Sequence, residues 1–225
     1  MNDTKQKLAL AEQKAKELFD TVEKRGLIVA GKSEWQLIDE VAQIAKADFG
    51  IEQFWHKKIV RAGINTLQPF NGNPPERMIQ QDDIVVLDFG PIFQGCEADL
   101  GRTYVIGNDP LKLQLKKDVE TAWYEAKEWY VNQSSLTGAA FFNYIIDLTK
   151  RYGYEFGNEI AGHLVGPFPH EQPDDPHDLC FDIHPDNHSS ILLLDKEGNS
   201  RNWILEIQFA DRVNNIGGFF EQLLN

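Results

Sequence analysis

Apolar side chains recur at helical spacing in four stretches of this 225-residue chain, two in each half. Residues three, four or seven apart in an α-helix share one face, so each stretch predicts an amphipathic helix with a buried stripe. Ser33 followed by Gln36 has the form of a capping box and predicts the start of the second helix. The predicted helices run over roughly Thr4–Lys24, from Ser33 onward, over roughly Leu111–Asn132 and over roughly Ala139–Tyr152.

Segments rich in β-branched and aromatic residues follow each pair of helices. Phe54–Val60 predicts a strand that ends in a turn, and Asp82–Gly107 predicts two strands joined by a short turn. Trp203–Ala210 and Gly218–Leu224 predict the last two strands. Each half of the chain therefore has the order helix, helix, strands, which suggests a structural duplication.

Two segments predict long loops because Pro, Gly, Asn, Asp and His dominate them: Leu67–Arg77 and Pro167–Asn187. Loops as long as the second are usually functional or disordered. The length of the chain allows one domain with a large core over residues 1–225. Its expected halves are about 1–107 and 108–225.

Two acidic residues stand out in the predicted hairpin. Asp88 ends an apolar strand, and Asp99 follows eleven residues later on the other side of the turn. A buried carboxylate is unfavourable unless a positive charge pairs with it. Two partners fit this pattern: Arg102, which is close in the sequence, or a metal ion.

Two more acids and a histidine have similar surroundings. Glu206 lies in WILEIQF and Glu221 in GGFFEQLL, both β-rich and apolar, and His163 lies in GHLVG. One such acid is most often an edge-strand residue or a paired charge, whereas four acids with a histidine favour a cation site. Carboxylates with a single imidazole suit Mn, Fe, Co or Zn rather than a thiolate-bound structural zinc.

Composition narrows the classes of function. The formal net charge of −13 argues against a nucleic-acid surface, which requires a basic patch, and is compatible with cation binding. Only Cys96 and Cys180 are present, which excludes a disulfide framework and predicts a cytoplasmic protein. The N-terminus has no apolar signal-peptide core, and no apolar run is long enough for a bilayer, so no membrane association is expected.

Four segments carry a family resemblance: VLDFGPIFQGCEADLGRTYVIG, GHLVGPFPHEQP, LEIQFAD and FFEQLL. Together they contain two aspartates, a Gly-His, a second histidine seven residues later and two glutamates near the end. In this order they resemble the pita-bread metallopeptidases, which include methionine aminopeptidase, aminopeptidase P and prolidase and share their fold with creatinase. The resemblance covers nearly the whole chain. It implies an α+β fold in which two pairs of helices cover a curved, mostly antiparallel sheet with pseudo-twofold halves.

The resemblance also implies two divalent metal ions on the inner face of that sheet. By motif position, Asp88 would chelate one metal, and Asp99 and Glu221 would bridge both. His163 and Glu206 would complete the other metal site. Two cations that share one water lower its pKa and make a bridging hydroxide available for attack on a peptide carbonyl.

Two residues have catalytic roles by the same resemblance. Glu206 would take and pass the proton, a role that needs a carboxylate within hydrogen-bond reach of the water. His170 would hydrogen-bond the scissile region or the developing oxyanion, and a solvated loop histidine is the alternative interpretation.

Two further segments favour the proline-directed branch of the family. GINTLQP (Gly63–Pro69) is similar to a segment of prolidase and aminopeptidase P, and DLGRT matches their Asp-x-x-Arg-Thr. Methionine aminopeptidases generally lack this arginine. We expect Arg102 to pair with a metal-binding carboxylate and support it, with a surface arginine as the alternative.

The sequence departs from the family pattern at two places. Phe70 replaces the histidine that normally follows the proline of the GINTLQP segment. His56 lies fourteen residues upstream and is interpreted as a strand or surface histidine, although Phe70 and His56 are both candidates for the substrate pocket. Glu206 and Glu221 are closer in sequence than in the family, so the register of Glu221 is the least fixed of the five ligands.

The sequence therefore predicts a dinuclear metallo-exopeptidase, an aminopeptidase or dipeptidase that hydrolyses an N-terminal peptide bond, with Xaa-Pro as the favoured substrate class. Its expected cofactors are two divalent ions, and its expected partner is a short peptide or peptide-like molecule. Prolidase-like relatives often pair, which leaves a homodimer open. Two alternatives are a non-peptidase pita-bread protein that binds peptides or partner proteins, and a creatinase-like hydrolase of a small C–N substrate.

Overall fold

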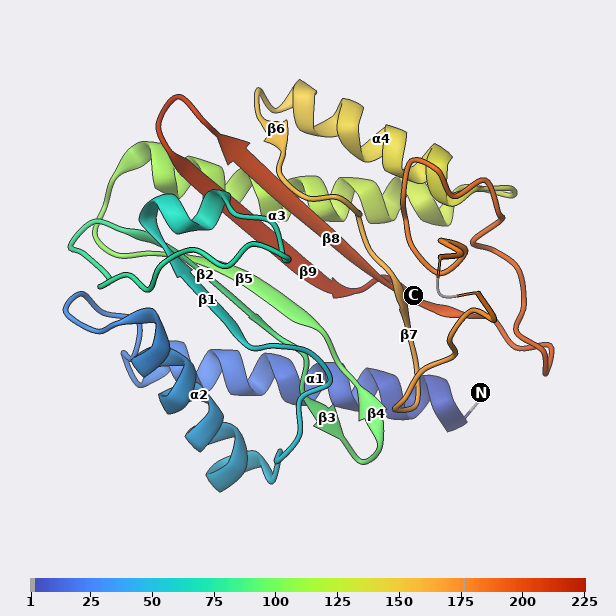
Figure 1. Cartoon of the computed structure of the whole chain (residues 1–225), viewed down its shortest axis with the longest axis horizontal. Coiled ribbons are helices and arrows are strands. Elements are labelled where there is room, and N and C mark those ends of the chain that lie inside the picture. Colours follow the sequence, from blue (N-terminus) through green and yellow to red (C-terminus); the bar gives the residue numbers. More distant parts are fainter. Residues whose placement is uncertain (1–2, 176) are drawn as a thin grey trace.

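An antiparallel sheet forms the centre of the computed structural model, which describes residues 3–175 and 177–225 (Figure 1). The strands of this sheet are β1 (Ile59–Ala62), β2 (Ile84–Phe89), β5 (Leu100–Val105), β6 (Glu155–Phe156), β7 (Leu164–Val165), β8 (Asn202–Asp211) and β9 (Ile216–Leu223). They are arranged in the order β1-β2-β5-β9-β8-β6, and β7 pairs with β8. A separate hairpin consists of β3 (Ile92–Phe93) and β4 (Cys96–Glu97).

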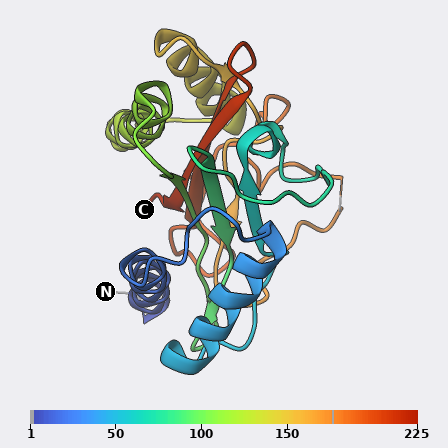
Figure 2. The ribbon, with the colours of Figure 1, turned by 90° about the vertical axis from the view of Figure 1, so that its left-hand side faces the viewer.

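Two pairs of helices cover the sheet, one pair over each half. α1 (Asp3–Lys24) and α2 (Glu34–Phe49) share a core with β2, and α3 (Pro110–Val131) and α4 (Gly138–Arg151) share a core with β8. Figure 2 shows α1 and α3 on the same side of the sheet. The four predicted helices are confirmed to within two residues where an end was predicted. The capping box at Ser33 is present.

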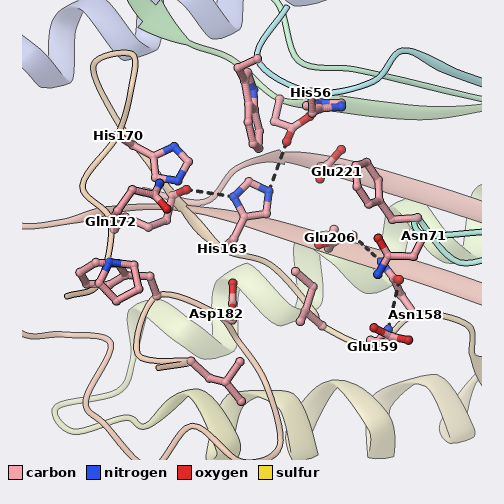
Figure 3. Close-up of a pocket in the computed structure, with 18 of the residues that line it drawn as sticks. His56, Asn71, Asn158, Glu159, His163, His170, Gln172, Asp182, Glu206 and Glu221 are labelled. Carbon is pink, nitrogen blue, oxygen red and sulfur yellow. Dashed lines mark hydrogen bonds and ion pairs between the residues drawn. The ribbon is translucent and has the colours of Figure 1, made fainter. Parts of the chain in front are cut away.

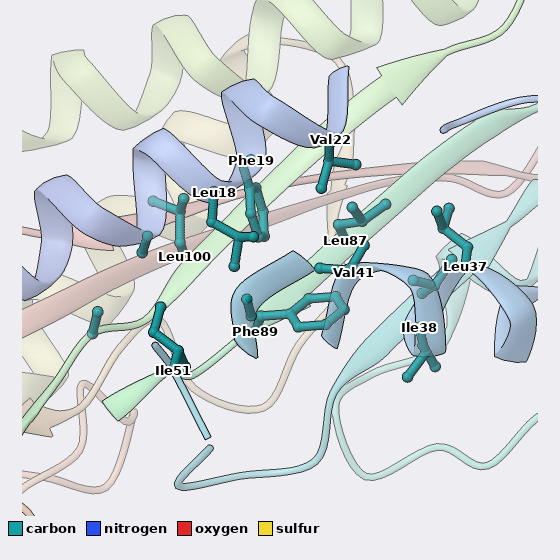
Figure 4. Close-up of a cluster of buried hydrophobic side chains, with 14 of the residues drawn as sticks. Leu18, Phe19, Val22, Leu37, Ile38, Val41, Ile51, Leu87, Phe89 and Leu100 are labelled. Atoms are coloured by element: carbon teal, nitrogen blue, oxygen red, sulfur yellow. The ribbon is translucent and has the colours of Figure 1, made fainter. Parts of the chain in front are cut away.

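The alternation of side chains along each central strand separates the core from the opposite face. On β2, Phe89 packs edge-on against Phe19 of α1, with ring centroids 5.9 Å apart (Figure 4). Its neighbour Asp88 lines a pocket on the other face. On β8, the residues on either side of Glu206 belong to the core beneath Trp123 of α3. The helices therefore bury one face of the sheet, and the acids emerge on the other face.

Two strand predictions are wrong in part. The segment 55–58 is not a strand, because β1 begins at Ile59 and continues through Ala62 into a 3-10 helix, η1 (Gly63–Leu67). Trp55 instead turns toward the sheet and donates a hydrogen bond from Nε1 to the carbonyl oxygen of Ala98 at 3.0 Å. The predicted pairing of β2 with β5 is confirmed, but the β3–β4 hairpin replaces the short turn between them.

The two predicted loops lack strands, apart from isolated bridges, and Leu67 belongs to the end of η1. Pro176, within the second loop, lies outside the described residues. No helix in 3–175 or 177–225 combines the length and the apolar composition that crossing a bilayer requires.

Glu34, the first residue of α2, joins three separate segments through one buried carboxylate. It accepts hydrogen bonds from the backbone N–H of Ala62 at 2.7 Å, from Asn65 Nδ2 at 3.0 and 3.1 Å, and from the backbone N–H of Arg77 at 3.0 Å. Both carboxylate oxygens are therefore acceptors. This carboxylate fixes η1 and the following loop against α2.

Glu34→Gln should destabilise the fold, because an amide nitrogen cannot accept the hydrogen bonds that one carboxylate oxygen now receives. We expect the free energy of unfolding to fall by about 2 kcal/mol and the melting temperature to fall by about 4–8 °C, measured by calorimetry. Glu52→Gln is the matched control, since its side chain is 69% exposed. Equal melting temperatures for both variants would contradict this role of Glu34.

Candidate metal centre

One row of paired residues crosses the sheet and carries three of the predicted ligands. Asp88 on β2 pairs with Gly101 on β5, Gly101 pairs with Glu221 on β9, and Glu221 pairs with Glu206 on β8. Directly paired residues in antiparallel strands point to the same face. A Cβ atom at Gly101 would lie 2.3 Å from the ring of Phe219, so the middle of the row has room only for glycine. The register of Glu221 agrees with its predicted place among the ligands.

Asp99 lies at the centre of this face, two residues before Gly101. Its Oδ1 atom is 3.0 Å from Nε2 of His56, and its Oδ2 atom is 3.2 Å from Nε2 of His163. Asp99 also shares a hydrogen bond with Glu221. One carboxylate thus contacts two imidazoles and a second carboxylate.

A pocket of about 410 Å³ opens above the row (Figure 3). All five predicted ligands line it, and each of the four acids among them is no more than 6% exposed. His170, Phe70 and His56 line the same pocket. The structure therefore brings every sequence-predicted ligand and substrate-pocket residue together in one cavity.

The acids of this cluster compete for a limited amount of positive charge. Burial and the neighbouring acids raise the pKa of Asp88 to about 7 and that of Glu206 to about 8, and burial also raises the pKa of Glu221 well above its usual value. Burial alone would raise the pKa of Asp99, but His56 and His163 outweigh it and lower that pKa.

The two histidines show the complementary effect. Burial opposes the charged imidazolium, yet Asp99 and Asp88 raise the pKa of His56 to about 9, and Asp99 and Glu206 raise that of His163 to about 9. Both imidazoles therefore favour the protonated state while they face these carboxylates.

The donor atoms of the cluster fit divalent cations. Asp88 Oδ1 and Glu221 Oε2 are buried and accept no hydrogen bond from the described part of the chain. Within 3–175 and 177–225, two overlapping groups bring their ligand atoms within 4.8 Å of one another: His56, Asp88 and Asp99, and Asp99, His163 and Glu221. Buried carboxylate oxygens with imidazole nitrogens suit hard or borderline metals, and Asp99 belongs to both groups.

A glutamate that the sequence analysis missed fixes His170. Glu97 of β4 is 2% exposed and accepts hydrogen bonds from the backbone N–H groups of Gly166 and His170, both at 3.1 Å. Its Oε2 atom is also 2.8 Å from Nδ1 of His170. His170 is therefore an anchored side chain, not a solvated loop histidine. The close spacing of Glu97 to Asp99 in GCEAD was the available signal.

Asn158 is a second residue that the sequence analysis missed. It donates a hydrogen bond from Nδ2 to Oε2 of Glu206 at 2.7 Å and lines the pocket. This contact fixes one carboxylate oxygen of Glu206. No pattern in the surrounding sequence marks Asn158 as part of the site.

Arg102 does not have the predicted partner. Strand alternation places it on the face opposite Asp99, where its guanidinium stacks 3.9 Å from the ring centroid of Phe220. It donates hydrogen bonds to the backbone carbonyl of Glu221 at 2.7 Å and to Gln222 Oε1 at 2.5 Å. Arg102 thus supports the backbone of a predicted ligand rather than a carboxylate.

His56 also differs from its expected place. It was interpreted as a strand or surface histidine, but it lies outside any strand, and its side chain is only 8% exposed. Its ring meets that of Phe70 edge-on, with centroids 5.7 Å apart. Arg61 holds the backbone of Phe70 through a hydrogen bond to its carbonyl at 3.2 Å.

The GINTLQP segment leads into Phe70 and is held against the sheet. Thr66 accepts a hydrogen bond at its hydroxyl oxygen from the backbone N–H of Gly217 at 2.7 Å, and its carbonyl accepts one from Gln208 at 2.9 Å. With Asn65 bound to Glu34, this segment ties the first half of the sheet to β8 and β9.

Comparison with known proteins agrees with this geometry. The sequence profile of metallopeptidase family M24 matches residues 6–193. The Xaa-Pro dipeptidase of Pyrococcus horikoshii is 28% identical over 149 residues, which are 65% of this chain and 41% of that protein. A crystal structure of prolidase from Thermococcus sibiricus is 26% identical with a TM-score of 0.70, covering 96% of this chain and 55% of that one.

A methionine aminopeptidase structure from Thermotoga maritima has the same fold, with a TM-score of 0.74 at 17% identity, and 92% of its chain is covered. The α+β pita-bread fold is therefore confirmed.

The chain spans about half the length of the prolidase-type relatives that it matches. The profile ends before β8 and β9, so the placement of Glu206 and Glu221 rests on the sheet register. Because the profile match covers most of the chain, this protein belongs to metallopeptidase family M24, on the side of its prolidase-like members.

Proposed function

We propose that this chain is a dinuclear metallo-exopeptidase that hydrolyses the N-terminal bond of a short peptide. The observation that carries the proposal is Asp99, a buried carboxylate shared by two groups of possible metal ligands in one pocket. Two cations in such a site supply an acidified water and polarise a carbonyl oxygen. Asp88, Asp99, His163, Glu206 and Glu221 would hold them.

Glu206 is suited to move a proton. One of its oxygens is fixed by Asn158, and burial raises the pKa of its carboxyl to about 8. A carboxylate with such a pKa can accept a proton near neutral pH and pass it to a leaving amine. Cations bound nearby would lower this pKa, whereas the hydrogen bond from Asn158 orients the Glu206 carboxylate in either case.

His170 is suited to orient the substrate. Its Nδ1 faces Glu97, so its Nε2 is the nitrogen left for the pocket. In the imidazolium form, Nε2 donates a hydrogen bond to a carbonyl or oxyanion. Glu97 holds the ring through Nδ1 and acts as a positioning residue.

Xaa-Pro peptides are the favoured substrate class for two reasons. Several relatives that match the chain are named Xaa-Pro dipeptidases, and the GINTLQP segment is similar to one in prolidase and aminopeptidase P. The pocket is of a size for a few residues, and Phe70 adds an apolar surface to it. The ligand set suits Mn²⁺, Co²⁺, Fe²⁺ or Zn²⁺.

Asp99→Ala should abolish hydrolysis and the stabilisation that added metal confers. Wild-type protein with Mn²⁺ or Co²⁺ should cleave Xaa-Pro dipeptides, with Met-initiated peptides as the comparison substrates. A metal concentration one hundred times its Kd stabilises the folded state by about 2.7 kcal/mol, which corresponds to roughly 5–11 °C in melting temperature. We expect the variant to lose both this metal-dependent rise in melting temperature and all peptide hydrolysis.

Glu159→Gln is the matched control for Asp99→Ala, because Glu159 lines the rim of the same pocket and is exposed. It should keep the metal-dependent increment. Metal binding without turnover on any peptide would overturn the peptidase proposal and favour a binding protein or a creatinase-like hydrolase. An unchanged increment in Asp99→Ala would show that Asp99 holds no metal.

Metal affinity should fall as pH is lowered from 8 to 6. Asp88 and Glu206, with pKa values of about 7 and 8, and the two histidines, at about 9, carry protons in this range, and a cation must displace them. Each proton displaced below its pKa weakens apparent binding by about tenfold per pH unit. Calorimetric titration in two buffers of different ionisation enthalpy measures the protons released. Binding without proton release would contradict the raised pKa values.

Glu97→Gln should lower kcat by about 10–100-fold while metal affinity stays unchanged, because it releases His170. The double variant Glu97→Gln/His170→Ala should be no slower than His170→Ala alone, since Glu97 acts through that imidazole. Steady-state kinetics of the three variants test this coupling. Additive losses would show that Glu97 has a separate role.

A further inference from the structure

His56 and His163 are held in the same way on opposite sides of Asp99. His56 Nδ1 is 2.7 Å from the carbonyl oxygen of Lys57, and His163 Nδ1 is 2.9 Å from that of Leu164, in each case the next residue in the chain. Their Nε2 atoms face different oxygens of Asp99, at 3.0 and 3.2 Å. Figure 3 shows both imidazoles at the pocket.

The backbone carbonyls determine which nitrogen carries the proton in each neutral ring. A carbonyl accepts hydrogen bonds only, so Nδ1–H donates to it, and Nε2 keeps its lone pair toward the acids. A second hydrogen bond of this kind is how proteins fix the orientation of metal-binding histidines. Without a cation, each ring meets the acids as an imidazolium whose Nε2–H faces a carboxylate oxygen, whereas a bound cation takes the place of that proton and is held by the Nε2 lone pair.

The distances around His56 suit a shared cation. Its Nε2 atom is 3.0 Å from Asp99 Oδ1 and 3.7 Å from Asp88 Oδ1, and the latter oxygen is buried without a hydrogen bond from the described residues. With bonds of about 2.0–2.2 Å and angles of about 90–110°, two ligand atoms on one cation are about 2.8–3.6 Å apart. The separations of His56 Nε2 and His163 Nε2 from Asp99 fall in this range, and the separation of His56 Nε2 from Asp88 is slightly longer than its upper end.

The imidazole of His56 is packed in place. Trp55 is anchored by its hydrogen bond to Ala98 and lies edge-on to His56, with ring centroids 4.6 Å apart. A Cβ atom on Gly90 would lie 2.2 Å from the His56 ring and 2.4 Å from Trp55. Because Gly90 has no side chain, both rings approach the end of β2, next to Asp88.

We propose that His56 is a sixth metal ligand, which binds through Nε2 the cation held by Asp88 and Asp99. Each of the two cations would then have one imidazole, His56 on one side of Asp99 and His163 on the other. This assignment rests on the proposed dinuclear centre but not on peptidase activity. The proposal gives different roles to the two candidate pocket residues, because His56 has a metal-binding nitrogen and Phe70 lines the pocket without a ligand atom.

The test counts coordinated imidazoles in the intact chain. Metal-free protein is loaded with two equivalents of Co²⁺, and proton NMR records the strongly shifted, solvent-exchangeable N–H signals of cobalt-bound histidines. Wild type should show two such signals, one from each Nδ1–H. His56→Gln should retain one signal and should bind one of its two Co²⁺ ions at least about tenfold more weakly, measured by calorimetry.

His163→Gln should retain the other signal, and His170→Gln is the control that should retain both, since His170 contacts Glu97 instead of the carboxylate cluster. A single signal in wild type, or two signals that persist in His56→Gln, would overturn the proposal. A single signal in wild type decides against the proposal even if a variant folds poorly. A chain that shows two signals but hydrolyses no peptide would refute the proposed function and still support His56 as a ligand.

Discussion

Four carboxylates share a space from which the fold excludes most water, and this is the constraint on which the site depends. Asp88, Asp99, Glu206 and Glu221 are all buried, and they point to one face of the sheet. Without positive charge they cannot all ionise, which is why burial and mutual repulsion raise three of their pKa values. Two imidazolium ions compensate only part of this charge. The two divalent cations of the proposed centre would compensate it fully and would turn an unfavourable arrangement into a binding site.

The sheet assembles this cluster through register. The pairings across β2, β5, β9 and β8 place Asp88, Glu221 and Glu206 in one row, and Asp99 precedes Gly101 of that row by two residues. The β8–β9 hairpin pairs Glu206 directly with Glu221, so the short spacing between them in the sequence is compatible with the site. Gly101 has no side chain, so the ring of Phe219 fits beside the middle of the row. The apolar residues that alternate with the acids along the strands pack against the helices on the other face of the sheet.

The helices and the acids could be predicted from the sequence because each depends on local periodicity or on an unusual residue in an apolar strand. Arg102 was given the wrong partner because proximity in sequence says less than strand alternation, which places it behind Asp99. His56 was misplaced because FWHKKIV has the composition of a strand, while tertiary contacts of Trp55 turn the segment inward. Glu97 and Asn158 were missed because their roles are contacts with residues more than forty positions away.

The β3–β4 hairpin, which the sequence did not predict, leads into the segment that holds the site together, residues 97–99. Three consecutive residues at its end each hold a different part of the site: the Glu97 carboxylate holds His170, the Ala98 carbonyl holds Trp55, and Asp99 contacts both His56 and His163. Trp55 in turn packs edge-on against all three histidine rings, with centroids 4.6 to 5.6 Å apart. The distances between the imidazoles are therefore set by one rigid side chain and one short segment. Since that segment also carries the carboxylate shared by both groups of possible ligands, a shift of its backbone would displace the proposed metal ligands and His170 together.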